Sequence, residues 1–474
     1  MEISKKTFVR EYTRAIWDGT AAIFAGAGTS RESGFVNWKE LLRPMSEEIK
    51  LDIEKENDYL AVAQYYKDAS RSRGAINQSI MDCFSNGVTE NEKVEILARL
   101  PISTYWTTNY DELIEDALKR NNRKVDVKMD SDQLAMVRPD RDAVVYKMHG
   151  DVNHAARAVL TKEDYMFYEK NRPLFRTLLK SDLLTKHFLF VGFSFNDPNI
   201  DFIMGQISTF LGENTGTHYW LTTKAQREEG ETEEEYRYNL RKQEMKSNEL
   251  AYYGIKTVYT DTYKEVTEVL RDIERAVKLN NVFISGSADC YGSWTKEAAE
   301  LLAEKIAAEL VKENFRVVSG FGIGIGSSVI NGALREIYAS KYKHTGKYLT
   351  LRPFPQGIKD EAERKATFTK YRTDMIAETG IAIFLFGNKK DSADPEKIIN
   401  ADGCMEEYQI AKKNGNIIIP IGSTGYAAEE ILKEIEGDMT SYSYLKKYMG
   451  TLKTEKDIDK LVSVIMEIVK EQRS

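Results

Sequence analysis

Cysteine is scarce in this chain, with Cys83, Cys290 and Cys404 the only three among 474 residues. They lie far apart in sequence, which excludes a CxxC metal module and argues against a disulfide framework. The chain also lacks an apolar run of the roughly 20 residues that span a bilayer, and its first residues do not lead into a signal-peptide core. We therefore expect a cytoplasmic protein with buried thiols and no bound metal.

Positive charge is also in deficit. Lys and Arg total 67 against 74 Asp and Glu, a net charge of -7. This balance argues against a general nucleic-acid binder, although it leaves room for a local basic pocket that takes a small anion. The share of hydrophobic residues, 42%, is that of an ordinary globular chain, and the length predicts about two to three domains.

What the chain does have is a long alternation of apolar β-type segments with helical patterns. The expected strands begin near residues 21, 102, 143, 187, 218 and 255, and then near residues 282, 315, 348, 381 and 417. Strands that alternate with helices predict parallel sheets. We therefore predict an α/β protein of two Rossmann-like, doubly wound domains, residues 1–278 and 279–474. Helical patterns fill residues 38–99, so the first domain should carry a helical insertion after its first strand.

Polar and small residues follow four expected strands of the first domain, where ligands bind in open parallel sheets. They are Gly26, Ala27, Gly28 and Ser30 after the first, Asn109 and Asp111 after the second, His149 after the third, and Gly192 and Ser194 after the fourth. Glycines at a strand end let backbone N–H groups approach a phosphate, although the same residues also make an ordinary tight turn.

Two of these side chains suit catalysis. An imidazole such as that of His149 is a common general base, and the amide of Asn109 can hydrogen-bond a ribose hydroxyl or a water. Structural alternatives remain open: His149 as a solvated loop residue, Asn109 as a turn residue, and Asp111 as the cap of the following helix.

These motifs occur in the order of the sirtuin motifs GAGxS, QNxD, HG and GxS, and about the first 275 residues resemble that family. The resemblance implies that Gly26, Ala27, Gly28 and Ser194 bind NAD, that Asn109 holds the nicotinamide ribose and a water, and that His149 is the base. Cleavage of the nicotinamide bond leaves an oxocarbenium-like ribosyl centre, which water attacks once a base takes its proton.

The departures from the sirtuin pattern are informative. No cysteine lies between Cys83 and Cys290, so the four-cysteine zinc module of deacylating sirtuins is missing, and Thr108 stands where sirtuins have glutamine. We therefore expect an NAD glycohydrolase that releases nicotinamide and ADP-ribose, not an NAD-dependent protein deacylase. NAD would be its substrate, and no cofactor is expected.

The richest glycine run lies in the second domain, in residues 319–328 between an expected strand and a helix. Alternating glycines there can expose N–H groups to an anion at the helix start. With nearby cations and a carboxylate, this region looks like the SLOG family, which binds nucleotide-derived molecules. The candidate residues for such a signal are Ser285, Gly286, Gly322, Gly324, Gly326, Arg372, Lys389 and either Glu406 or Glu407.

The order of sirtuin-like then SLOG resembles the effectors of the Thoeris bacterial anti-phage system over nearly the whole chain. In that family a TIR-domain partner makes a cyclic ADP-ribose isomer, the SLOG domain senses it, and the sirtuin-like domain destroys NAD. The resemblance implies that Arg372 and Lys389 bind the phosphates of the signal, and that the chain works as a homo-oligomer, a tetramer or larger, without nucleic acid or membrane. The alternative outside enzymology is a nucleotide-binding sensor in which Asn109 and His149 only line a pocket.

Overall fold

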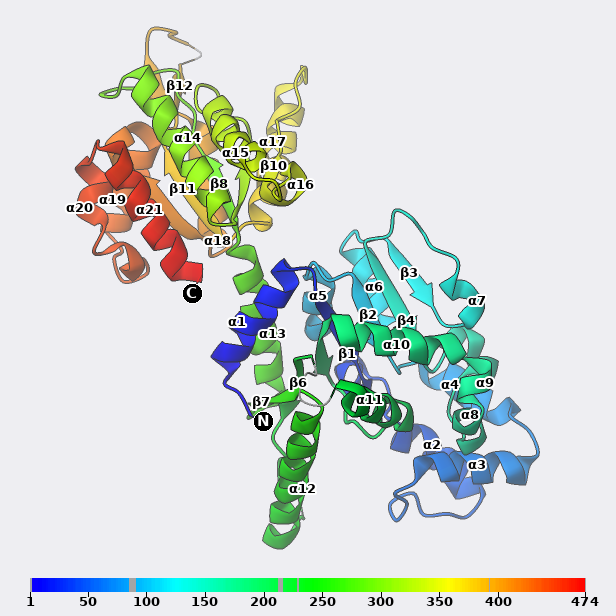
Figure 1. Ribbon diagram of the computed structural model, residues 1–474. Coiled ribbons are helices and arrows are strands. Elements are labelled where there is room, and N and C mark those ends of the chain that lie inside the picture. The colour runs from blue at the N-terminus through cyan, green and yellow to red at the C-terminus, as the bar shows by residue number, and fades with distance from the viewer. Residues whose placement is uncertain (1, 85–90, 212–215, 228–229, 392, 474) are drawn as a thin grey trace. The chain divides into compact units, whose positions relative to one another are not determined.

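The computed structural model describes residues 2–84, 91–211, 216–227, 230–391 and 393–473 (Figure 1). The chain forms two compact units, residues 1–274 and 275–474. Helix α13 (Tyr263–Lys278) runs across the division between them. Among the described residues, no helix is both long and apolar enough to cross a membrane.

The first unit is built on a seven-stranded sheet in the order β3-β4-β2-β1-β5-β6-β7, with every neighbouring pair parallel. The strands are β1 (Ala21–Ala25), β2 (Thr104–Thr107), β3 (Val125–Lys128), β4 (Ala143–Lys147), β5 (His187–Val191), β6 (His218–Thr223) and β7 (Ile255–Thr260). From β1 the chain first builds the sheet toward β2 and β4, and later returns to add β5 on the other side. The order thus reverses beside β1, and the carboxyl edge at this switch point is where open α/β sheets bind ligands.

Helices cover both faces of this sheet. On one face, α10 and α11 pack on β1 and β5 through apolar side chains that include Phe175, Ile203, Phe24 and Phe190, while α1 contacts β1, β5 and β7. The helices are α1 (Lys5–Trp17), α2 (Trp38–Glu48), α3 (Tyr59–Ser70), α4 (Gly74–Phe84), α5 (Glu92–Arg99), α6 (Leu113–Arg120), α7 (Ser131–Leu134), α8 (Lys162–Met166), α9 (Tyr168–Asn171), α10 (Pro173–Thr185), α11 (Pro198–Leu211) and α12 (Glu233–Tyr252). The predicted fold class is confirmed, and α2 to α5 form the expected helical insertion.

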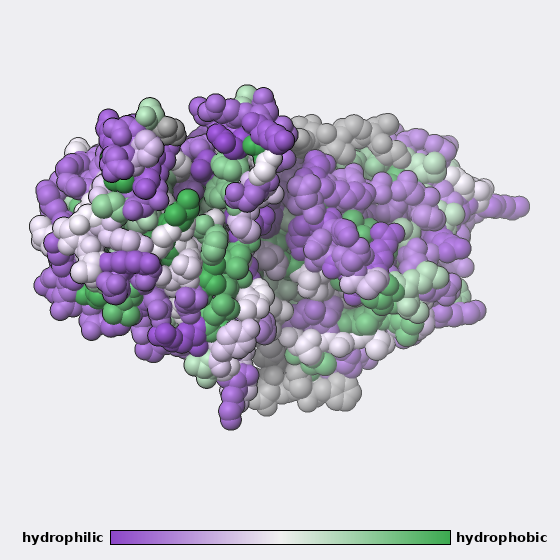
Figure 2. Space-filling model, turned by 90° about the horizontal axis from the view of Figure 1, so that it is seen from above, coloured by the Kyte–Doolittle hydropathy of each residue, from purple (hydrophilic) through white to green (hydrophobic). Residues whose placement is uncertain are grey.

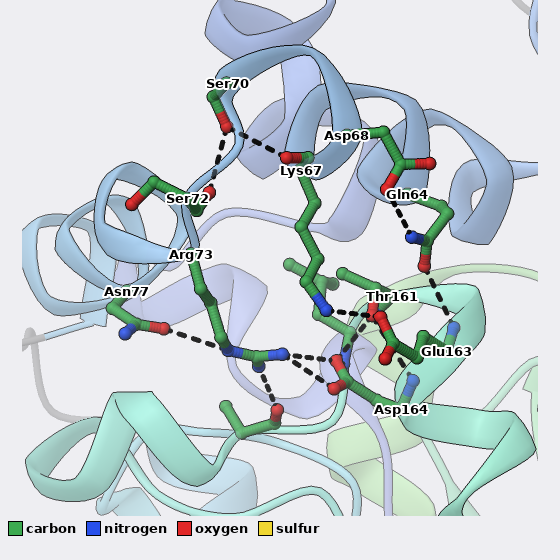
Figure 3. A network of polar contacts seen from close by, with 12 residues as sticks. Gln64, Lys67, Asp68, Ser70, Ser72, Arg73, Asn77, Thr161, Glu163 and Asp164 are labelled. Carbon is green, nitrogen blue, oxygen red and sulfur yellow. Dashed lines mark hydrogen bonds and ion pairs between the residues drawn. The ribbon is translucent and has the colours of Figure 1, made fainter.

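Polar contacts fasten the helical insertion to the chain that follows β4 (Figure 3). Arg73, just before α4, donates from Nη1 to both carboxylate oxygens of Asp164 at 2.7 Å and also donates to the carbonyl of Ala158. Lys67 on α3 pairs with Glu163 at 2.5 Å. Burial would raise the pKa of Asp164, but the Arg73 guanidinium holds it below its ordinary value. The insertion is therefore anchored to the segment just beyond His149.

The second unit is a five-stranded parallel sheet in the order β10-β9-β8-β11-β14, with a separate antiparallel pair of β12 and β13. Its strands are β8 (Asn281–Ser285), β9 (Arg316–Ser319), β10 (Leu349–Leu351), β11 (Ile381–Leu385), β12 (Asn388–Lys390), β13 (Ile398–Asn400) and β14 (Ile417–Ile421). Its helices are α14 (Lys296–Lys312), α15 (Gly326–Ala339), α16 (Thr345–Tyr348), α17 (Glu361–Ala377), α18 (Asp402–Lys413), α19 (Tyr426–Glu436), α20 (Met449–Thr454) and α21 (Ile458–Arg473).

The face of the molecule seen in Figure 2 is largely hydrophilic, with smaller hydrophobic areas between the hydrophilic ones.

Candidate active site

The glycine turns after β1 and β5 pack directly against each other. The N–H groups of Gly26 and Gly28 donate to the carbonyls of Val191 and Gly192, at 3.0 and 2.8 Å. A Cβ on Gly26 would lie 2.5 Å from the Gly192 oxygen, and one on Gly192 (φ +61°) 2.4 Å from the Thr29 nitrogen. These glycines are required by the close approach of two backbones, and both N–H groups already have protein acceptors. Contact of this turn with NAD stays a prediction.

Gly192→Ala is expected to destabilise the protein by about 2–5 kcal/mol, because the new Cβ meets backbone that cannot yield and the left-handed conformation disfavours a side chain. Gly19 is a matched control, since its φ is +71° but a Cβ there would meet nothing within 4 Å. Gly19→Ala should cost only the conformational strain, about 1–2 kcal/mol. Urea unfolding followed by tryptophan fluorescence measures both variants, and equal losses would contradict the packing argument.

Asn109 belongs to a short chain of hydrogen bonds at the end of β2. Its Nδ2 donates to the carbonyl of Gly26 at 3.1 Å and to Ser30 Oγ at 2.9 Å. Ser30 Oγ donates in turn to Asp111 Oδ2 at 2.7 Å, and Asp111 Oδ1 accepts from the Leu113 nitrogen at 3.1 Å. Both amide hydrogens of Asn109 are thereby used, so its carbonyl oxygen remains to accept a hydrogen bond from a ribose hydroxyl or a water.

A buried lysine lies next to this chain of hydrogen bonds. Lys147, at the end of β4, is fully buried and lies 2.8 Å from Glu115 and 2.5 Å from Asp151. It also donates to the backbone carbonyl of Asp111 at 2.6 Å. Burial raises the pKa of Asp111 and of Glu115, and the charge of Lys147 opposes that rise. Sequence reasoning missed this network, although a lysine inside an apolar strand was a signal for it.

His149 lies on the loop after β4, and β4 is the neighbour of β2 in the sheet. The side chain of His149 is only 1% exposed. Its Nε2 lies 3.0 Å from Asp197 Oδ2 and 3.2 Å from the Tyr165 hydroxyl, which itself donates to Asp197 Oδ2 at 2.8 Å. His149 Nδ1 has no hydrogen-bond partner among the described residues. The ring of Trp38 lies 6.2 Å from the imidazole.

The partners of His149 were not singled out from the sequence. Burial would raise the pKa of Asp197, but its contacts with His149 and Tyr165 hold it below the ordinary value. Asp197 follows β5 just before Pro198 begins α11, and a carboxylate at that place was a possible signal. The sequence held no such signal for Tyr165, on α8, because its contact with His149 depends only on tertiary packing.

The structure thus brings Gly26, Ser30, Asn109 and Asp111 into contact and places His149 after the neighbouring strand. Asn109 is 8% exposed, so both candidate catalytic side chains are buried in this conformation. Two other residues predicted to bind NAD, Ala27 and Ser194, lie outside this chain of side-chain hydrogen bonds. Ala27 begins a short 3-10 turn, and Ser194 is exposed in the loop before α11.

In the second unit the glycine run packs against the turn after β8. A Cβ on Gly322 would lie 2.0 Å from the Gly286 oxygen, and one on Gly324 (φ +79°) 2.2 Å from the Ala288 oxygen. The sequence predicted that the helix follows residue 328, whereas α15 begins at Gly326, within the glycine run. Ser285 Oγ, at the end of β8, donates to Glu407 Oε2 at 2.6 Å.

The two candidate phosphate-binding cations are paired with carboxylates. Arg372 donates to Glu406 at 2.7 Å and lies 3.4 Å from Glu407, while Lys389 lies 2.6 Å from Asp402. All three acids are on α18. Burial raises the pKa of Glu407, against the opposing effects of Ser285 and Arg372. Arg372 also stacks over the ring of Phe354, 4.9 Å from its centroid.

Comparison with known proteins also assigns the two halves of the chain to two different families. A SIR2-like domain family matches residues 103–257, and the Sir2- and TIR-associating SLOG family matches residues 265–472. The chain is 44% identical to the NAD(+) hydrolase ThsA of Bacillus cereus over 98% of this chain and 97% of that protein. It is 41% identical to the protein of that name from Acinetobacter baumannii over 99% of both chains. A more distant match is defense-associated sirtuin 2 of Bacillus subtilis, 26% identical over 47% of this chain and 23% of that protein.

The resemblance that the motifs indicated is therefore confirmed in both halves. With 40–44% identity over nearly the full length of four relatives, the chain belongs to the ThsA family of NAD(+) hydrolases, the effectors of Thoeris.

Proposed function

We propose that the protein hydrolyses NAD to nicotinamide and ADP-ribose, and that a cyclic ADP-ribose isomer bound to the second unit activates it in bacterial anti-phage defence. The observation that carries the catalytic part is the pair of Asn109 and His149, which follow the neighbouring strands β2 and β4 at the carboxyl edge of the sheet. The names of the relatives, NAD(+) hydrolase ThsA, support the same reaction.

The chemistry follows from the atoms that these side chains leave available. The bond between nicotinamide and ribose breaks, nicotinamide takes the bonding electron pair, and the ribosyl centre becomes oxocarbenium-like. The carbonyl oxygen of Asn109 orients a water or a ribose hydroxyl, and His149 accepts a proton from the attacking water. The products are nicotinamide, ADP-ribose and one proton. NAD is the substrate, bound in the proposal along Gly26, Ala27, Gly28, Gly192 and Ser194, and no cofactor takes part.

Activation is proposed to begin at the cations of the second unit. Arg372 and Lys389 are held by acids on α18, and the phosphates of a cyclic ADP-ribose isomer would compete for both. Ser285 and Glu407 would hydrogen-bond its ribose hydroxyls, beside the glycine run. To activate, the ligand must bind the active arrangement more tightly than the resting one, and such couplings are typically about 1–3 kcal/mol. A TIR-domain partner would supply the ligand, and a homo-oligomer would transmit the change.

The test is turnover by the purified full-length chain. NAD loss and the formation of nicotinamide and ADP-ribose are followed by chromatography, with and without individual cyclic ADP-ribose isomers. We expect turnover that rises with one isomer, and this rise should be lost in Arg372→Ala. No turnover under any of these conditions would contradict the catalytic proposal, and equal turnover with and without every isomer would contradict the proposed activation. Formation of O-acetyl-ADP-ribose from NAD and an acetylated peptide would favour a deacylase instead.

A further inference from the structure

We propose that Asp197 is a positioning residue which, together with Tyr165, fixes the tautomer and the ring orientation of His149 so that Nδ1 faces the reaction with its lone pair. The inference rests on the proposed NAD hydrolysis, because it specifies how His149 is prepared to take a proton. Asp197 itself does not touch the reacting atoms in this proposal.

The direction of each hydrogen bond follows from the donors available. An ionised carboxylate only accepts, and the Tyr165 hydroxyl has a single hydrogen, which it donates to Asp197 Oδ2 at 2.8 Å. His149 Nε2 faces that same oxygen at 3.0 Å and the Tyr165 oxygen at 3.2 Å. Both neighbours can accept from Nε2, so the imidazole hydrogen belongs on Nε2. Nδ1 is then the atom with the lone pair.

Nδ1 itself supports this assignment. It is buried and has no partner among the described residues, whereas buried polar atoms in folded proteins are nearly always hydrogen-bonded. A substrate hydroxyl or the attacking water would supply the missing hydrogen bond. The groups packed on the imidazole are Asp197 from the loop before α11, Tyr165 from α8, and the ring of Trp38 from α2. They come from three separate elements, so the ring has little freedom to turn.

Backbone hydrogen bonds fix the position of the Asp197 carboxylate. Its Oδ1 accepts from the backbone nitrogens of Asn199 and Ile200, at 2.8 and 3.3 Å, at the start of α11. Its Oδ2 is left for Tyr165 and His149. One oxygen therefore stabilises the helix and the other orients the imidazole, which makes the two roles separable by mutation.

The substitution Asp197→Asn separates the helix-capping role of Asp197 from its role in orienting His149. An asparagine keeps an oxygen that can cap α11, but it presents an NH2 group to His149 Nε2. That donor requires a lone pair on Nε2 and moves the imidazole hydrogen to Nδ1, the wrong tautomer for accepting a proton there. We expect kcat to fall by about 10³-fold or more with KM changed by less than about threefold. Tyr165→Phe, which removes one of the two acceptors, should lower kcat by about tenfold.

A second readout does not depend on turnover. The protein has five histidines, and ¹⁵N-labelled imidazole spectra, with His149→Asn to identify the signal, report which ring nitrogen carries hydrogen. We expect Nε2–H in the parent protein and Nδ1–H in Asp197→Asn. The matched control is Asp201→Asn, an exposed acid on the same helix, which should leave both kcat and the spectrum unchanged.

The outcomes distinguish this inference from the proposed function. Parent-level kcat in Asp197→Asn, or an unchanged His149 tautomer, would overturn the positioning role. A loss of kcat accompanied by unfolding of α11, seen as lower helicity and thermal stability than in Asp201→Asn, would also overturn it in favour of a capping role. If the parent protein does not hydrolyse NAD at all, the proposed function fails, while the ¹⁵N spectra still decide the tautomer.

Discussion

Asn109→Ala is expected to lower NAD hydrolysis by at least about 10²–10³-fold in kcat/KM while the protein stays folded. The substitution removes the amide whose two hydrogens are fixed by Gly26 and Ser30, and with it the oxygen proposed to orient the water or ribose hydroxyl. Among the described residues, the Ser30 hydroxyl would then keep Asp111 as its one side-chain partner, and no other amide would hold the water or ribose hydroxyl in place. In cells the same variant should leave NAD levels untouched on activation.

The control for this prediction is Asn239→Ala, an exposed asparagine of α12 in the same unit, whose amide donates to Glu231. It should hydrolyse NAD like the parent protein. Thermal unfolding of Asn109→Ala, followed by tryptophan fluorescence, checks that the fold survives. A folded Asn109→Ala protein with parent-level turnover would remove Asn109 from the chemistry and favour a pocket that only binds nucleotide.

The sheets could be predicted where a strand lies in an apolar run between helical segments, and not at one strand with two charged residues or at a short antiparallel pair. All but three of the strands correspond to apolar runs. The exceptions are β3, and β12 with β13, which have three or four residues each. In β3 the charged side chains of Asp126 and Lys128 are buried because they pair with each other at 2.9 Å and because Asp126 also bonds Arg141. A sequence pattern registers the charges but not the partners that make their burial possible.

The candidate site shows the same limit. Strand ends are adjacent in any parallel sheet, so the positions of Asn109 and His149 followed from the motifs and the fold class. The contacts of His149 with Tyr165 and Asp197 depend on how α8 and α11 pack, which no local pattern encodes. The glycines illustrate a second limit. A run of glycine permits an approach to phosphate and an approach to backbone equally well, and the structure shows the backbone approach at Gly26, Gly192 and Gly322.

Lys147→Met is expected to destabilise the first unit by about 3–5 kcal/mol, since removing one partner of a buried ion pair leaves uncompensated charge. Glu115 and Asp151 would both lose their contacts with the lysine. For a unit of this size the loss corresponds to a fall in Tm of roughly 6–20 °C. Four of the five tryptophans lie in this unit, so intrinsic fluorescence follows its unfolding. Lys119→Met, at an exposed lysine paired with Asp116, should cost no more than about 0.5 kcal/mol.

The pH dependence identifies the cause of that loss. Burial already raises the pKa of Glu115 and Asp111 in the folded protein, and without Lys147 it should rise further. A carboxyl with a higher pKa in the folded state than in the unfolded state binds a proton more readily when folded, so acidification stabilises the fold. The deficit of Lys147→Met should therefore be smaller near about pH 5 than near about pH 8. Adding Glu115→Gln should restore part of the stability at the higher pH. A deficit independent of pH, with no recovery in the double variant, would mean that lost packing of the lysine stem causes the destabilisation, not unbalanced charge.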